Sequence, residues 1–276
     1  MGTVIVSIVV YLIAQPEITT ANFWWCFLSG AMWAGAQMLQ YRSFELIGVS
    51  GGMPISTGMQ LTANSVVGAL FLGDWPTLGQ RVVGFSAIAL IIFGIWMTTR
   101  KERALQSSTA AVSSGAPAAY NEGNAAKSNM KTGILVLAIG TIGYVGFSFF
   151  PARFHVEGRA AFLPQALGMV SGALLFSLFY LKQRPFSLPS IKNMLGGFIF
   201  ALAVLLYLIS INLNGVSIAA SMTQMNVILA TLGGIYVLGE RRTRWELRNV
   251  YIGLLIVLIG GIMVGLSSTE AVANLL

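Results

Sequence analysis

Long apolar runs, separated by short polar segments, make up most of the chain. A helix needs about 20 mostly apolar residues to cross a hydrocarbon core about 30 Å thick. The runs are continuous rather than alternating, which favours membrane helices over the strands of a barrel. We therefore predict an all-α integral membrane protein with about nine transmembrane helices: Thr3–Ala14, Ala21–Tyr41, Met53–Leu72, Val82–Thr98, Thr132–Phe150, Phe162–Leu181, Met194–Ile211, Val216–Val237 and Tyr251–Leu266.

A polar stretch rich in Ala, Ser and Gly, residues 100–131, separates the fourth and fifth of these spans. This composition is typical of a flexible linker, here between a first half (residues 1–99) and a second half (residues 132–276). Thirteen of the 16 basic residues fall in even-numbered loops and three in odd-numbered ones. The positive-inside rule then predicts a multi-pass protein of the cell membrane, with a cytoplasmic linker, a cytoplasmic N-terminus and an extracellular C-terminus.

The two halves repeat one another at a nearly constant offset. Gly-Val-Ser opens a span at residues 48–50 and again at 215–217, and Leu-Gly-acid closes one at 72–74 and again at 238–240. Farther upstream, Gly30 matches Gly197 and Gly2 matches Gly168. The separation is 166–167 residues throughout, which indicates an internal repeat.

The repeat also predicts the size of its unit. The second half has five predicted spans and the first has four, so we expect a five-helix unit whose first helix is missing from repeat one. A genuine nine-helix protein is the alternative. An odd number of helices per unit inverts one half relative to the other, and inverted repeats are typical of transporters that bind substrate near the membrane midplane.

One stretch of sequence resembles a known family. The run Gly-Gly-Met-Pro-Ile-Ser-Thr-Gly-Met-Gln-Leu at 51–61, followed by Phe-Leu-Gly-Asp-Trp at 71–75, is similar to the glucose/ribose porter family of bacterial sugar uptake proteins. That family belongs to the drug/metabolite transporter superfamily, whose members have ten helices in a five-plus-five inverted repeat. The resemblance implies sugar uptake driven by a proton gradient, and uncoupled facilitated transport is the alternative.

Composition excludes several other classes of protein. The chain is 56% hydrophobic and 9% charged, whereas soluble domains carry about 25% charged residues. A cytosolic enzyme, a disordered chain and a secreted disulfide scaffold are therefore excluded. A single cysteine, Cys26, allows neither an internal disulfide nor a Cys-based metal cage, and a single histidine, His155, argues against a His-rich catalytic centre. We expect no enzyme activity, no cofactor, no metal and no nucleic acid, and we expect a neutral sugar, a coupling proton and the lipid bilayer as partners.

Polar but uncharged side chains inside the spans are the candidate binding residues. The absence of central charged residues argues against an exporter of cationic drugs and against a cation channel. Amides offer both donors and acceptors to sugar hydroxyls, and a tryptophan can stack on a pyranose ring. Residues spaced three or four apart share a helix face, so polar residues at that spacing are favoured as candidates. Further polar candidates within the spans are Gln40, Tyr144, Ser148 and Tyr207. The predicted substrate-binding residues are Trp33, Gln37, Ser56, Gln60, Asn64, Ser221, Gln224 and Asn226.

Proton coupling requires a group that titrates. Three carboxylates near span ends, Glu45, Asp74 and Glu240, are the candidates, although an ion pair at a helix end is the simpler interpretation for Asp74 and Glu240. Two functions remain as alternatives to sugar uptake: an exporter of another small metabolite of the same superfamily, and a non-transporting membrane protein.

Two further groups of residues are predicted to have structural roles. Tryptophans near span ends are expected to anchor the protein at the membrane interface. Glycines within the spans are expected to let helices approach closely. The tryptophans are Trp24, Trp25, Trp75 and Trp96, and the glycines are Gly30, Gly35, Gly58, Gly168, Gly233 and Gly234.

Overall fold

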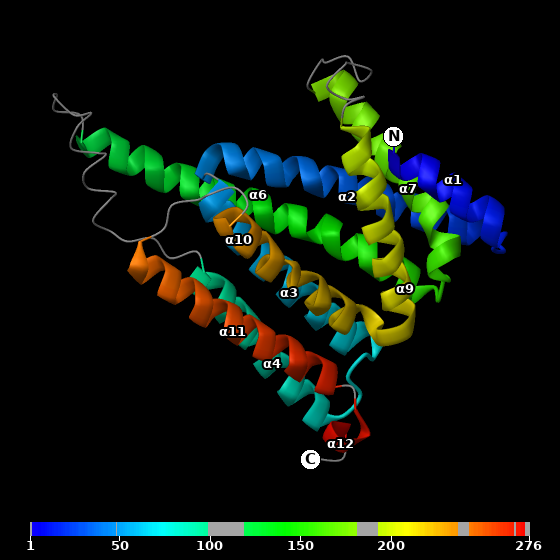
Figure 1. The fold of residues 1–276 in the computed structure, drawn as a ribbon. Helices are drawn as coiled ribbons and strands as arrows, with labels where there is room; N and C mark the ends of the chain where they lie inside the picture. Colours follow the sequence, from blue (N-terminus) through cyan, green and yellow to red (C-terminus); the bar gives the residue numbers. More distant parts are fainter. Residues whose placement is uncertain are drawn as a thin grey trace.

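The computed structural model describes residues 2–47, 49–98, 119–180, 193–236, 243–267 and 269–273, and the regular structure within these ranges is entirely helical (Figure 1). Two helices end in a π-helical turn, η1 or η2. The elements are α1 (Gly2–Ala14), α2 (Thr20–Ile47), α3 (Val49–Val67), η1 (Gly68–Leu72), α4 (Leu78–Thr98), α6 (Ala119–Arg153), α7 (Gly158–Leu175), η2 (Phe176–Tyr180), α9 (Met194–Gln224), α10 (Asn226–Tyr236), α11 (Arg244–Ser267) and α12 (Glu270–Ala273).

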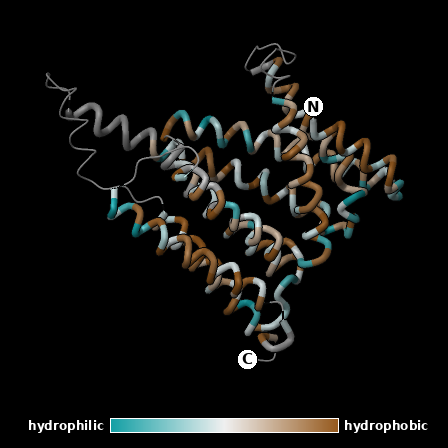
Figure 2. Tube along the Cα trace, in the orientation of Figure 1, coloured by the Kyte–Doolittle hydropathy of each residue, from teal (hydrophilic) through white to brown (hydrophobic). Residues whose placement is uncertain are grey.

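Six helical segments of the described ranges are long and apolar enough to cross a membrane, as judged by length and composition. The shorter apolar helix α1 comes in addition to these six. Figure 2 shows hydrophobic positions along the middle of α11 and hydrophilic ones near its start, as expected of a spanning helix. The prediction of an all-helical membrane protein is confirmed at this level.

Several element boundaries differ from those predicted, since α2 extends to Ile47 rather than Tyr41 and α11 begins at Arg244 rather than Tyr251. The seventh predicted span and the first part of the eighth form one element, α9, in which the chain reverses direction at Gly215, a residue with non-helical angles (φ 81°, ψ 167°) (Figure 1). The rest of the eighth predicted span is the separate helix α10. Helix α6 begins at Ala119, before the predicted Thr132. The expected linker lies outside the described residues as far as residue 118, and its remainder is the first part of α6.

Helices from the two halves pack against one another. Helix α2 packs on α6 and α7, α1 on α7 and α9, and α4 on α11, while α3 lies against both α6 and α9. Large apolar side chains such as Leu12, Ile199 and Leu258 are exposed on the outer faces, where a membrane protein contacts lipid. The helix pairs thus surround polar side chains in the interior.

Gly30 and Gly168 hold α2 and α7 together, as predicted. A Cβ on Gly30 would lie 2.1 Å from the carbonyl oxygen of Gln165, and one on Gly168 would lie 2.0 Å from that of Phe27. The same prediction is wrong for Gly35 and Gly58, where a Cβ would meet nothing nearer than 3.8 Å. Gly233 and Gly234 lie outside the residues whose side-chain environment is described.

Of the four tryptophans predicted to anchor at the interface, one is misassigned. Trp24, Trp25 and Trp96 are exposed, whereas Trp75 is fully buried. Its ring packs edge-on against Phe85 and fills the space over Gly84. The loop after η1 folds inward onto α4, and this tertiary contact buries the side chain.

Candidate functional site

A cavity of about 470 Å³ lies among α2, α3, α6, α9 and α10, so both halves of the chain contribute to its wall. The side chains that form the wall are amides, hydroxyls, aromatic rings and small apolar groups, without a charged group among the described residues that line it. They are Trp33, Gln37, Gln40, Met53, Thr57, Gln60, Asn64, Tyr144, Phe147, Ser148, Phe200, Ala203, Val204, Tyr207, Ala220, Thr223 and Asn226.

Amides and hydroxyls from three helices form one connected network in this wall. The Tyr144 hydroxyl of α6 lies 2.8 Å from Gln37 Oε1 and 2.7 Å from Gln40 Oε1, both on α2. The Gln40 amide reaches α3, where its Nε2 is 2.7 Å from Ser56 Oγ. Gln60 Nε2 is 2.8 Å from the same oxygen. The network ties α2, α3 and α6 together and fixes the amides of Gln37 and Gln60 at the cavity surface.

Aromatic rings form another part of the wall. The Trp33 ring lies 5.1 Å from that of Phe200 and 6.4 Å from that of Phe147, and Phe147 stacks on Tyr207. The Tyr207 hydroxyl is hydrogen-bonded to Ser148 at 2.8 Å. Flat apolar rings beside hydrogen-bonding groups match a sugar, which has C–H faces and a rim of hydroxyls.

Asn64 is left with an unsatisfied acceptor at the cavity. Its Nδ2 donates to the backbone oxygen of Gln60 at 2.9 Å, while its buried Oδ1 has no partner among the described residues. A buried polar atom without a partner is unfavourable unless a ligand or water supplies one. Asn64 therefore has an acceptor without a partner in the described residues, on a side chain that lines the cavity.

The structure brings together most of the predicted binding residues. Five of them line the cavity: Trp33, Gln37, Gln60, Asn64 and Asn226. Ser56 is buried behind the surface, where it joins the amides of Gln40 and Gln60. Ser221 is not among the lining residues, and its hydroxyl donates to the Ser217 carbonyl of its own helix. The side chain of Gln224 lies outside the described part of the chain.

Several lining residues were missed or underrated from sequence. Thr57, Phe147, Phe200 and Thr223 were not predicted, and Gln40 and Tyr144 were only secondary candidates although they join the network. Helical spacing was an available signal for two of them. Phe147 follows Tyr144 by three positions, and Phe200 precedes Tyr207 by seven, so each shares a face with a recognised polar residue.

Asp74 contacts the other half of the chain, unlike Glu45. Asp74 Oδ2 accepts a hydrogen bond of 2.6 Å from the backbone N–H of Ser217, at the start of the second part of α9. A carboxylate at this position complements the positive end of a helix dipole. Glu45 instead pairs with Arg42 at an exposed position, and Glu240 lies outside the described residues.

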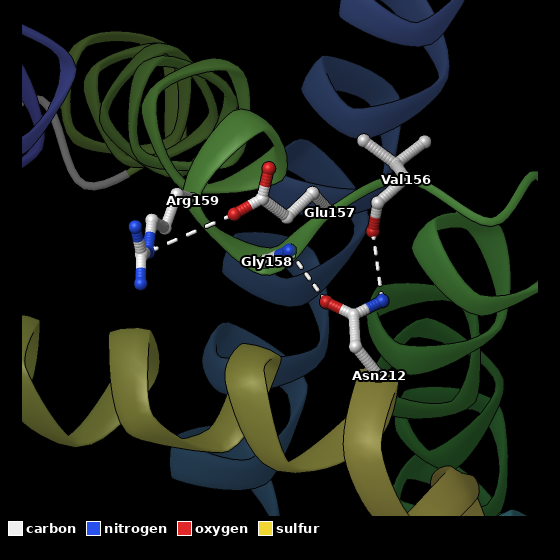
Figure 3. A network of polar contacts seen from close by, with 5 residues as sticks. All are labelled: Val156, Glu157, Gly158, Arg159 and Asn212. Atoms are coloured by element: carbon white, nitrogen blue, oxygen red, sulfur yellow. Dashed lines mark hydrogen bonds and ion pairs between the residues drawn. The ribbon is translucent and has the colours of Figure 1, made fainter. Parts of the chain in front are cut away.

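A second polar contact fixes the turn within α9, at Asn212, three residues before Gly215. The Asn212 side chain accepts a hydrogen bond from the N–H of Gly158, the first residue of α7, and donates one of 3.0 Å to the carbonyl of Val156 (Figure 3). Beside it, Glu157 and Arg159 lie 3.7 Å apart in an exposed pair. The Asp74 and Asn212 contacts together hold the turn at Gly215 against both neighbouring loops.

An apolar groove of about 700 Å³ lies among α3, α4 and α6. Its lining includes Met59, Thr62 and Ile92, and shares no residue with the polar cavity. Helix α3 therefore presents its amides to one space and its apolar residues to another.

Comparison with known proteins places these features in a family. The family model described as "Sugar transport protein" matches residues 1–267. The chain is 40% identical to the putative ribose uptake protein RbsU of Latilactobacillus sakei, over 94% of this chain and 84% of the relative. It is 36% identical to the probable glucose uptake protein GlcU of Priestia megaterium (98% and 88% covered) and 34% identical to the glucose uptake protein GlcU of Bacillus subtilis (98% and 88%). The resemblance noted in the sequence is thus confirmed, and the chain is a multi-pass membrane protein that belongs to the sugar transport protein family.

Proposed function

We propose that the protein carries a neutral sugar, of glucose or ribose type, into the cell by alternating access between two inverted repeats. The observation that carries the proposal is the cavity itself. Its described lining combines amides, hydroxyls and stacked rings, without a charged side chain, and it is shared between the two halves. A nucleotide sugar or a cationic drug would need charged partners, whereas a neutral sugar needs amides, hydroxyls and an aromatic face. No covalent bond changes in such a cycle.

Two equivalent helix contacts support the inverted repeat. Gly30 of α2 packs on the backbone of α7 close to Gly168, and Gly2 of α1 packs on α9 beside Gly197. Gly30 and Gly197 occupy matching positions, as do Gly168 and Gly2, at an offset of 166–167 residues. Each contact is therefore the counterpart of the other when the halves are exchanged, as a pseudo-twofold axis requires.

The pairing of α4 with α11 follows the same rule. A Cβ on Gly94 would lie 2.7 Å from the oxygen of Gly253, and one on Gly260 would lie 3.0 Å from that of Ala87. An offset of 166 converts Gly94 into Gly260 and Gly253 into Ala87. These contacts support a two-fold arrangement of five-helix units, with nine spans in this chain.

Hydrogen bonds between the two halves support the proposal that one end of the cavity is closed. Asp74 and Ser217 join the two halves, and the Ser217 hydroxyl also reaches the Ser65 carbonyl at 3.2 Å. In the topology predicted from basic residues, this end is extracellular. We take these contacts as the closed outer end of a carrier that faces the cytoplasm, with the N-terminus inside and the C-terminus outside.

The proposal predicts that Gln60→Ala weakens sugar transport. Gln60 is part of the amide network and lines the cavity, so its loss removes a direct partner of the sugar and frees Ser56. We expect the KM for glucose or ribose to rise about tenfold, the size expected for one or two hydrogen bonds. Uptake of radiolabelled glucose and ribose into proteoliposomes measures this.

Thr62→Ala is the matched control for that experiment. Thr62 is on the same helix, but it lines the apolar groove and its hydroxyl donates to the Gly58 carbonyl. Its replacement should leave KM unchanged. Equal KM values for Gln60→Ala and the wild type, or absence of saturable uptake by the folded wild type, would contradict the proposal.

Proton coupling is predicted to depend on Asp74. Its carboxylate joins the two halves by accepting a hydrogen bond from the Ser217 N–H, and Ala220, three residues farther along the same helix, lines the cavity. Asn at this position still accepts from Ser217 but does not titrate. We expect Asp74→Asn to abolish the stimulation of uptake by an inward proton gradient while sugar exchange at equal pH continues.

Glu45→Gln provides the comparison, because Glu45 belongs to an exposed ion pair with Arg42 and is expected to contribute little. This variant should keep its stimulation by the gradient. Loss of stimulation in Glu45→Gln but not in Asp74→Asn would reassign the coupling group. A wild type indifferent to the gradient would instead indicate facilitated transport.

A further inference from the structure

The hydroxyl of Tyr144 faces two amide oxygens at once. It is 2.8 Å from Gln37 Oε1 and 2.7 Å from Gln40 Oε1. A phenol has a single proton, so it can make a full hydrogen bond to only one of these oxygens. The other amide oxygen would face a lone pair of the Tyr144 oxygen at the same short distance, which is repulsive. One of the two amides must therefore be turned over, so that its nitrogen donates to Tyr144; the two ends of an amide have nearly the same shape, and the hydrogen bonds decide between them.

Ser56 decides which amide is turned. Its Oγ lies within 2.8 Å of the nitrogens of both Gln40 and Gln60. With two donors facing it, the Ser56 proton has no acceptor within the described part of the chain. Turning Gln40 over supplies that acceptor, Gln40 Oε1, and directs Gln40 Nε2 at the Tyr144 oxygen. Each hydroxyl then accepts once and donates once, the arrangement in which neighbouring hydrogen bonds strengthen one another.

We infer that a single directional chain of hydrogen bonds runs from Gln60 through Ser56, Gln40 and Tyr144 to Gln37, and that Tyr144 is the positioning residue that sets which end of the Gln37 amide faces the sugar. Tyr144 donates to Gln37 Oε1, which leaves Gln37 Nε2 as a free donor. At the other end Gln60 donates to Ser56, which leaves Gln60 Oε1 as a free acceptor. Both residues line the cavity.

This orientation predicts the direction of two hydrogen bonds to the sugar, and it rests on the proposed function. One sugar hydroxyl accepts from Gln37, and another donates to Gln60. Monofluoro and monodeoxy derivatives of glucose distinguish the two, because fluorine accepts weakly and does not donate, whereas hydrogen does neither. At the ring position that Gln37 recognises, the fluoro derivative should compete better than the deoxy derivative. At the position that Gln60 recognises, both should compete poorly.

The test measures competition by these derivatives against uptake of radiolabelled glucose into proteoliposomes. Tyr144→Phe keeps the ring but releases Gln37, so we expect KM for glucose to rise roughly fivefold to tenfold, as for one hydrogen bond, with Vmax little changed. At the ring position that Gln37 recognises, the fluoro derivative should no longer compete better than the deoxy derivative. Gln37→Leu should remove the same preference, and the double variant should behave like Gln37→Leu alone, since coupled residues are not additive.

Tyr207→Phe is the matched control. It also removes a phenol hydroxyl from the cavity wall, but one bonded to Ser148 and outside the chain of amides. This variant should keep the preference for the fluoro derivative. The inference is overturned if Tyr144→Phe keeps that preference or if Tyr207→Phe loses it. If Tyr144→Phe does not fold, the Gln37→Leu variant provides the test. The inference is also overturned if Gln37→Leu keeps the preference for the fluoro derivative. A folded wild type that takes up neither glucose nor ribose contradicts the proposed function instead.

Discussion

Replacing Gly215 with alanine is expected to abolish transport and to reduce the thermal stability of the purified protein. Gly215 has φ 81° and ψ 167°, a region open to glycine alone, where another residue costs about 1–3 kcal/mol. A Cβ there would also lie 2.5 Å from Asp74 Oδ1. The carboxylate would have to move away from the Ser217 N–H, and the loss of a charged hydrogen bond adds about 1.5–3 kcal/mol. Sugar uptake, and the midpoint of thermal unfolding in detergent, measure the two effects.

Gly73→Asn is the control for this prediction. Gly73 also has a positive φ, 76°, but its ψ of 23° places it in the left-handed region that asparagine tolerates. A Cβ there would meet nothing within 4 Å. We expect Gly73→Asn to fold and transport nearly as the wild type does. If Gly215→Ala did the same, the turn between the two parts of α9 would not depend on glycine, and the role given to Asp74 would weaken with it.

Replacing Gly168 with alanine is expected to have the second-largest effect. Its Cβ would lie 2.0 Å from the Phe27 carbonyl oxygen, so α2 and α7 would have to separate. Backbone atoms cannot rotate away as the end of a side chain can. The separation would also stretch the 2.7 Å hydrogen bond that buried Gln165 of α7 donates to Ser29 Oγ of α2. Overpacking of this kind costs about 1–3 kcal/mol or more, which should appear as a lower unfolding midpoint and a lower yield of folded protein.

Gly35→Ala tests the specificity of that effect on one of the same two helices. A Cβ on Gly35 would meet only the Phe176 ring, at 3.8 Å, an ordinary contact. Alanine favours a helix over glycine by up to about 1 kcal/mol in water, so this variant should be neutral or slightly stabilised. A midpoint for Gly168→Ala equal to that of Gly35→Ala would mean that the α2–α7 interface is not limited by backbone contact.

Much of the architecture could be read from periodicity and spacing. Apolar runs predicted where the helices lie, but α6 and α11 begin earlier and α2 ends later than predicted, because polar residues extend these helices beyond their apolar parts. The reversal between the seventh and eighth predicted spans falls at Gly215, which the repeat had marked. The site was predicted less completely. Helical spacing placed Gln60 and Asn64 on one face of α3, and both line the cavity. Thr223 was not predicted, because a hydroxyl in an apolar helix has no mark in the sequence that distinguishes a cavity from lipid.

The membrane class, the polar helix faces, the family and the hypothesis of a repeat could all be inferred from the sequence. Each of these depends on residue type and spacing along one chain. The packing of the helices distinguishes two similar serines: Ser56 meets the amides of Gln40 and Gln60, whereas Ser221 bonds its own helix. It also separated Gly168, which touches backbone, from Gly35, which does not. Both cases have the same cause. A hydroxyl bonds whatever lies within about 3 Å, and an added methyl clashes only with what lies nearer than van der Waals contact, so the neighbouring helix sets the role of the residue.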